Sequence, residues 1–183
     1  MTSAIELLVE ASRLARKRAL SLVEGLSDEQ LAWRPAPTAH AIGWTLWHLA
    51  RAADAYCSEL PWSEHAQIWT RERLAERWDI PAELLGSLGV GSVDVDDAAA
   101  ARLRLPPARE LIDYARRAFA ALDERIGRVR ESDLATEYES IIGAKGRTTV
   151  GGFLIGSLAH DNRHLGEMEY VKGLLGLRGT VTR

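Results

Sequence analysis

Two histidines, His160 and His164, lie four positions apart in an apolar stretch that runs from Thr148 or Thr149 to about Leu175. The spacing of apolar residues predicts one long helix there. On a helix, positions i and i+4 lie on the same face, one turn apart. At about 100° per residue, Phe153 and Val171 lie about 20° from His160. The histidine face is therefore expected to point into the protein, against another helix.

Three further stretches have helical spacing of apolar residues, and each is bounded by turn signals. They run from Ser3 to about Leu26, from His40 or Ala41 to about Leu60, and from Pro106 to about Arg130. Residues 81–105 predict a long crossover connection that carries a short helix. The sequence therefore predicts an all-α fold, a four-helix bundle with one long crossover, in a single domain over 1–183. The half of the last helix from Val150 to Ala159 is apolar on nearly every side, so it is expected to be the most buried helix segment.

Smaller features fill the connections between these helices. Ser27, with Gln30 three residues on, matches a capping box that starts a short helical turn. Residues 136–147 have room for a short extended stretch, although Gly143 and Gly146 argue against a long strand.

Composition excludes several classes of partner. The net charge of −3 over 183 residues gives no reason to expect nucleic acid. No apolar run reaches the roughly 18–20 residues that span a bilayer, and Glu6 and Glu10 interrupt any signal-peptide core. The single cysteine, Cys57, fits a reducing compartment. We therefore expect a cytoplasmic protein that binds neither nucleic acid nor membrane.

A third histidine, His48, lies within the second helical stretch and is the expected partner of the pair in the last helix. Cys57 lies about 180° round the same helix from His48 and faces away. His40 would lie about 12 Å from His48 along a continuous helix and is interpreted as a capping or surface residue. His65 falls in a polar segment and is expected to be solvated. The sequence thus predicts a divalent metal site made by His48, His160 and His164, with at least one coordination position open.

The pair on the last helix also has simpler explanations. Two histidines on one helix face can hydrogen-bond to backbone carbonyls without any metal. The string from His160 through Asp161 to His164 also resembles the zinc-protease motif, but it has aspartate in place of glutamate. Aspartate is one methylene shorter, so a protease is disfavoured.

Glu167, Trp44 and Arg51 are the neighbours of interest. Glu167 lies on the histidine face and can orient an imidazole, act as a weak fourth ligand or pair with Arg163. We favour an orienting role or a weak ligand over a general base. Trp44, one turn before His48, is a candidate wall of a substrate pocket, although packing is the simpler explanation. Arg51, one turn after it, can bind an anionic substrate or cofactor group, or pair with a carboxylate.

Two segments carry a resemblance to a known family. The stretch around His48, Ala41-Ile42-Gly43-Trp44-Thr45-Leu46-Trp47-His48-Leu49-Ala50, and the stretch His160-Asp161-Asn162-Arg163-His164-Leu165-Gly166-Glu167 resemble the metal-binding motifs of the DinB/YfiT-like superfamily. The resemblance spans nearly the whole chain and is weakest from Ser87 to Leu105. It implies a four-helix bundle in which the three histidines bind a divalent metal. It also implies a homodimer. Where some members have glutamine, this chain has Glu167.

The resemblance also implies two classes of function. Some members are enzymes that use low-molecular-weight thiols such as mycothiol or bacillithiol, so one expectation is a metal- and thiol-dependent S-transferase that acts on a small electrophile. The alternative is a metal-binding stress or interaction protein without turnover. Zinc or nickel is the expected metal, with manganese, iron and cobalt as alternatives. No side chain is assigned as catalytic; the reactive group would be a metal-bound water or thiolate. A deep pocket lined by Trp44, Arg51 and residues 62–78 would favour the enzyme.

Overall fold

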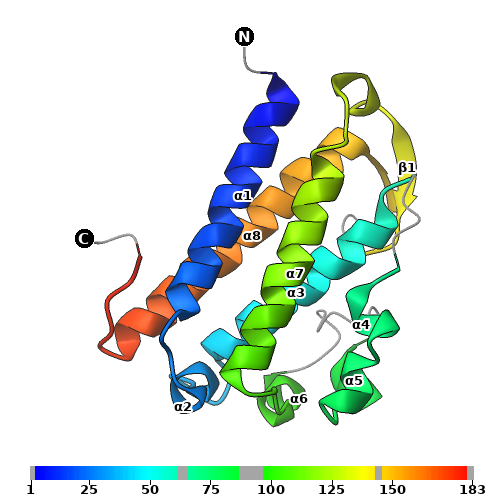
Figure 1. The fold of residues 1–183 in the computed structure, drawn as a ribbon. Helices are drawn as coiled ribbons and strands as arrows, with labels where there is room; N and C mark the ends of the chain where they lie inside the picture. The colour runs from blue at the N-terminus through cyan, green and yellow to red at the C-terminus, as the bar shows by residue number, and fades with distance from the viewer. Residues whose placement is uncertain (1–2, 62–65, 87–96, 143–145, 181–183) are drawn as a thin grey trace.

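A computed structural model describes residues 3–61, 66–86, 97–142 and 146–180. For residues 97–99 only the backbone is described. Four long helices form a bundle (Figure 1), as the sequence predicted. They are α1 (Ala4–Val23), α3 (Ile42–Glu59), α7 (Ala108–Ile126) and α8 (Val150–Leu174). Among the described residues, no helix combines the length and apolarity needed to cross a membrane.

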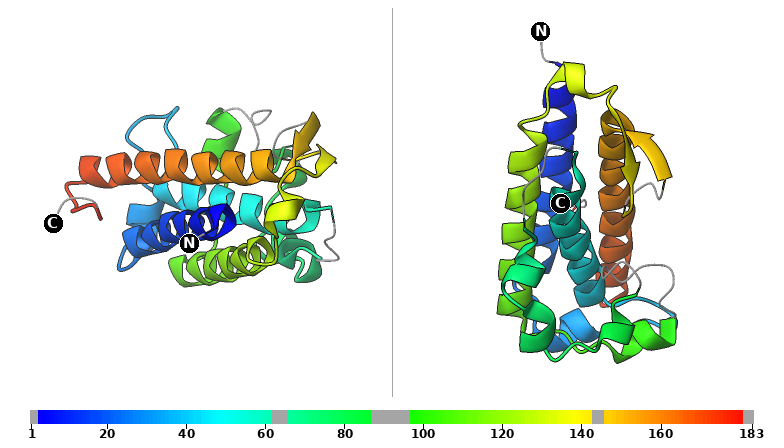
Figure 2. Two further views of the ribbon diagram at one scale, coloured as in Figure 1. Left: turned by 90° about the horizontal axis from the view of Figure 1, so that it is seen from above. Right: turned by 90° about the vertical axis from the view of Figure 1, so that its right-hand side faces the viewer.

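Around the bundle the helices follow the order α1, α7, α3, α8 (Figure 2). The helices α3 and α7 pack most extensively against each other, and α1 packs along α8. Because α3 and α8 are also neighbours, side chains on their facing sides can meet inside the bundle. The two helices that carry the three histidines are therefore adjacent, as the sequence predicted.

The most buried helix is α3, and not the first half of α8 as the sequence predicted. Every residue from Ile42 to Cys57 is buried, whereas Ile155 on α8 is 61% exposed. The reason is that α3 packs against α7 and α8 and is also covered by α2 (Asp28–Ala32) and α4 (Ile68–Arg71). An apolar surface alone does not say how many elements will cover a helix.

The helix starts follow local capping chemistry. The capping box predicted at Ser27 is confirmed: its hydroxyl accepts from the Gln30 backbone, and the Gln30 side chain accepts from the Ser27 backbone. A second capping box, Ser3 with Glu6, starts α1. Thr149 caps α8, accepting from the Gly152 backbone nitrogen at 3.0 Å. These caps fix where the helices begin and hence the rotation of their faces.

Short elements occupy the connections. Between α3 and α7 lie α4, α5 (Leu74–Arg77), a 3-10 helix (Ala82–Leu84) and α6 (Asp97–Arg102). The predicted short helix of the crossover is therefore present. A second 3-10 helix, Glu131–Asp133, follows α7.

The expected extended stretch is an antiparallel hairpin of β1 (Glu137–Ser140) and β2 (Gly146–Thr149). In this hairpin Glu137 pairs with Thr149. Tyr138 of the hairpin packs edge-on against Phe153 of α8. The hairpin therefore holds the start of α8 through an aromatic contact.

Candidate metal centre

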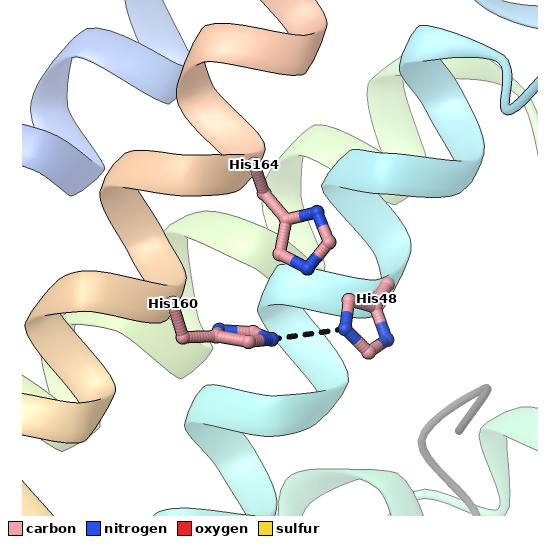
Figure 3. Close-up of side chains that lie close together, drawn as sticks. All are labelled: His48, His160 and His164. Atoms are coloured by element: carbon pink, nitrogen blue, oxygen red, sulfur yellow. Dashed lines mark hydrogen bonds between the residues drawn. The ribbon is translucent and has the colours of Figure 1, made fainter. Parts of the chain in front are cut away.

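Three imidazoles converge between α3 and α8 (Figure 3). His48 comes from α3, while His160 and His164 come from successive turns of α8. Nε2 of His48 lies 3.0 Å from Nε2 of His160, and one nitrogen from each of the three rings lies within 4.8 Å of the others. His48 and His164 are buried, and His160 is partly buried. Of the described residues that can ligate metals, only these three form such a cluster.

His164 is held from both sides of its ring. Nδ1 lies 2.6 Å from Oε2 of Glu167, and Nε2 lies 3.0 Å from Nη2 of Arg163. Because a guanidinium can only donate, Nε2 of His164 accepts, and the proton lies on Nδ1 and points at the carboxylate. Burial and the neighbouring His48 and His160 lower the pKa of His164 to about 2. The ring is therefore neutral, and its Nε2 lone pair faces the cluster.

The carboxylate of Asp161 lies near the ring of His160, and no orienting role was predicted for it from the sequence. Oδ1 of the buried Asp161 lies 3.6 Å from Nδ1 of His160. Oδ2 of Asp161 accepts from Nε of Arg16 on α1 at 3.0 Å. Arg16 also pairs with Asp123 on α7 at 2.5 Å, and burial raises the pKa of Asp123. A chain of charges, in which Arg16 and Asp161 are buried and Asp123 is partly buried, thus links α1, α7 and α8 near His160.

Aromatic rings surround His48. Trp44 stacks on His48, with ring centroids 5.2 Å apart and planes within 6°. His40 stacks on Trp44 at 3.7 Å. It is partly buried and does not cap α3, whose N-cap is Ala41. His40 is not a member of the imidazole cluster.

Tyr56 is a further neighbour that the sequence analysis did not single out. Its ring packs 6.3 Å from that of His160 and 5.1 Å from that of Phe153. Burial and the nearby Asp161 raise the pKa of Tyr56, so the hydroxyl stays protonated. Its position was readable from spacing, because Trp44, His48 and Tyr56 follow one another at multiples of four residues along α3.

Arg51 lies in a buried polar network. Its guanidinium donates to Tyr114 at 3.1 Å and to Gln67 at 3.0 Å, and it pairs with Asp54 at 3.3 Å. It also lies over the ring of Trp69 at 4.7 Å. The structure thus shows Arg51 paired with a carboxylate and only 2% exposed. Its binding of an anionic substrate group stays a prediction.

The network around Arg51 has Asp54 at its centre. At the start of α4, Oδ1 of Asp54 accepts from the backbone nitrogen of Ile68 and Oδ2 accepts from that of Trp69, each at 2.8 Å. The hydroxyl of Tyr114 also donates to Oδ2 of Asp54, at 3.1 Å. This carboxylate therefore fixes the segment after α3 to the bundle.

Two other sequence predictions concern Cys57 and His65. Cys57 is a fully buried thiol and is not part of the imidazole cluster. Burial raises the pKa of Cys57 to about 12, with Asp54 adding to the shift. His65, expected to be solvated, lies outside the described residues.

The three imidazoles fit a divalent metal. A tetrahedral ion with nitrogens at about 2.0–2.1 Å separates its ligand atoms by about 3.3 Å, close to the 3.0 Å between Nε2 of His48 and Nε2 of His160. Both nitrogens cannot carry protons at that distance, so at least one offers a lone pair. Nδ1 of His160 is buried without a hydrogen-bond partner. A metal on the inward nitrogens would fix the proton on this Nδ1, facing Asp161.

The chain matches the family model of the DinB superfamily over residues 11–168. The chain belongs to the DinB superfamily. The match includes all three histidines, and the three side chains that the DinB-like motifs contribute are the ones that the fold brings together.

Solved structures agree on the DinB-like fold. A conserved protein from Enterococcus faecalis is 20% identical, has a TM-score of 0.77, and aligns over 96% of this chain and 99% of its own. A DinB-like protein from Bacillus cereus is 17% identical, has a TM-score of 0.66, and aligns over 100% of both chains. At these identities the similarity shows the fold alone. None of the curated proteins compared with the chain is a significant match.

Proposed function

We propose that this DinB-superfamily chain holds a divalent metal through His48, His160 and His164, and that it is a thiol-dependent S-transferase acting on a small electrophile. The observation that carries the proposal is a cluster of three imidazole ligands that no fourth ligating side chain joins among the described residues. Structural zinc sites have four protein ligands, whereas reactive sites keep a position open. The resemblance to thiol-using members of the family supplies the substrate class.

The proposed reaction joins a thiol to an electrophilic carbon. The sulfur forms a bond to that carbon, the leaving group departs with the electron pair of its bond, and the thiol proton passes to solvent. A bound divalent ion supplies Lewis acidity, which lowers the pKa of a coordinated thiol. Zinc or nickel is the proposed ion, since nitrogen ligands suit both.

The residues around the cluster would orient the ligands. Glu167, at 2.6 Å from Nδ1 of His164, fixes the tautomer that presents Nε2 inward. Asp161, held by Arg16, lies on the corresponding side of His160, but its Oδ1 is 3.6 Å from Nδ1 and makes no hydrogen bond to it. Trp44 packs on the face of His48 and limits its rotation.

One observation favours a second candidate, a metal-binding protein without turnover. Nη2 of Arg163 lies 3.0 Å from Nε2 of His164, in the direction a metal would take. The Arg163 side chain is 65% exposed, so it can move outward at low cost. If it returns over a bound ion, the open position is closed to substrate.

The test is thiol conjugation to monochlorobimane by protein purified without an affinity tag. Metal-loaded protein, metal-free protein and the His160→Ala variant are compared with several small thiols. The S-transferase predicts a rate above the uncatalysed reaction only in the metal-loaded wild type. If no thiol gives a rate above the uncatalysed reaction in protein that retains its metal, the S-transferase is contradicted. The metal-binding protein without turnover then remains.

A further inference from the structure

A cavity of about 450 Å³ lies beside the imidazole cluster, at the end of the bundle where α2, α6 and the starts of α3 and α7 meet. Trp44 lines it, but none of the three histidines does. Arg51 and the described part of residues 62–78 do not line it either. The pocket predicted from the sequence is therefore only partly matched, at Trp44. The cavity is a feature separate from the proposed metal site, within the size range of small-molecule pockets.

The wall of this cavity is mostly apolar and includes three charged residues. All of the described lining residues are apolar except Asp28, Arg34 and Arg104, and the apolar wall includes Leu31 and Leu111. A mostly apolar lining with a few polar groups is the usual composition of a ligand site.

The charges of the lining favour an anion. Asp28 Oδ1 already accepts from the backbone nitrogen of Ala108 at 2.7 Å, which ties its carboxylate to the start of α7. Arg34, whose Nε donates to the backbone carbonyl of Ala39, and Arg104 contribute two guanidinium groups against this one carboxylate. Arg104 is exposed, so its head can reach a ligand at the mouth of the cavity. Guanidinium groups bind carboxylates through paired hydrogen bonds.

The shape of the cavity is set by a close backbone approach. A side chain at Gly43 would place its Cβ 2.9 Å from the carbonyl oxygen of Leu31, so α2 and α3 meet there without intervening side chains. The cavity lies beside this contact, with Trp44 among its lining residues. His40 and His48 stack on the Trp44 ring, so Trp44 contributes to the apolar wall without offering a free stacking face.

We propose that this cavity is a binding site for a small aromatic or otherwise apolar molecule that carries one carboxylate. The apolar body lies against Trp44, Leu31 and Leu111, and the carboxylate lies toward Arg104 and Arg34. The site goes beyond the proposed transferase function and requires neither metal nor thiol.

The experiment is isothermal titration calorimetry of the metal-free full chain with naphthoate and with its neutral amide, naphthamide. One saturable site is expected, with naphthoate bound about two- to fivefold more tightly, the range of a partly exposed ion pair. Arg104→Gln should reduce that preference, because only Arg34 then remains to attract the carboxylate. Arg109→Gln, a matched change at an exposed arginine outside the lining, should keep it.

Ala101→Trp supplies the steric test, because Ala101 is an exposed residue of the lining and a large side chain there should occupy cavity volume. This variant should bind neither ligand. Absence of saturable binding to the wild type, equal affinity for acid and amide, or full binding by the Ala101→Trp variant would each overturn the proposal. Because the titration uses no metal or thiol, its outcome is independent of the conjugation assay.

Discussion

Removing the Glu167 carboxylate should weaken metal binding by about tenfold. Oε2 of Glu167 lies 2.6 Å from Nδ1 of His164, the length of a strong charge-assisted hydrogen bond. Such bonds contribute roughly 1.5–3 kcal/mol, but Glu167 is 44% exposed, and solvent screening favours the lower end. About 1.4 kcal/mol corresponds to a tenfold change in Kd. That value also lies in the range of about 10–100-fold for losing the partner of a metal-bound histidine.

The assay is competition for zinc against a chromophoric chelator, with wild type and three variants. Glu167→Ala should raise the Kd about tenfold. Glu167→Gln should raise it less, by about two- to fivefold, because the amide oxygen still accepts from Nδ1 but carries no charge. Glu10→Ala, at an exposed position on α1, is the control for loss of one carboxylate and should leave the Kd unchanged.

An unchanged zinc Kd in the Glu167→Ala variant would refute this reasoning. It would mean that Glu167 contacts His164 without affecting the lone pair on Nε2. An equal loss in the Glu10→Ala variant would also contradict it, because the effect would then reflect net charge alone.

Three other predictions concern stability and reactivity. Asp54→Ala removes a fully buried carboxylate that pairs with an arginine and accepts from backbone nitrogens at the start of α4. In urea unfolding, the free energy of unfolding should fall by about 3–5 kcal/mol. The control Asp113→Ala, at an exposed position, should lower it by less than about 0.5 kcal/mol. Gly43→Ala should lose about 1–3 kcal/mol in the same assay because its Cβ would meet backbone at 2.9 Å, whereas Gly156→Ala, with nothing within 4 Å, should gain roughly 0.5–1 kcal/mol. The raised pKa of Cys57, about 12, keeps its thiol protonated at a pH of about 8. Cys57 should therefore not react with a disulfide reagent at that pH, about 8, until the chain is unfolded. Rapid labelling of the folded protein, equal losses at both aspartates or equal effects at both glycines would contradict the respective prediction.

The predictions that succeeded rest on helical periodicity. Spacing places His160 and His164 on one face of α8, and the order of long helical stretches brings α3 beside α8. Residues three apart on a helix lie on the same face, so the spacing also predicted that Glu167 lies beside His164. Periodicity serves well here because the site lies on regular helices.

Other features depend on contacts between distant segments, which periodicity does not encode. The expected capping role of His40 is wrong, because the N-cap of α3 is Ala41, and His40 instead stacks on Trp44. The link from Arg16 through Asp161 to His160 joins residues more than a hundred positions apart. The cavity beside Trp44 depends on how α2 and α6 close the end of the bundle. Each of these required the assembled fold.

The central claim is that His48, His160 and His164 hold one divalent metal. The direct measurement is metal content by mass spectrometry, for protein purified without an affinity tag and for the His48→Ala and His160→Ala variants, each checked for folding by circular dichroism. The account predicts about one divalent ion per chain in the wild type and a near-complete loss in both folded variants. Metal content that is unchanged in both variants would contradict it.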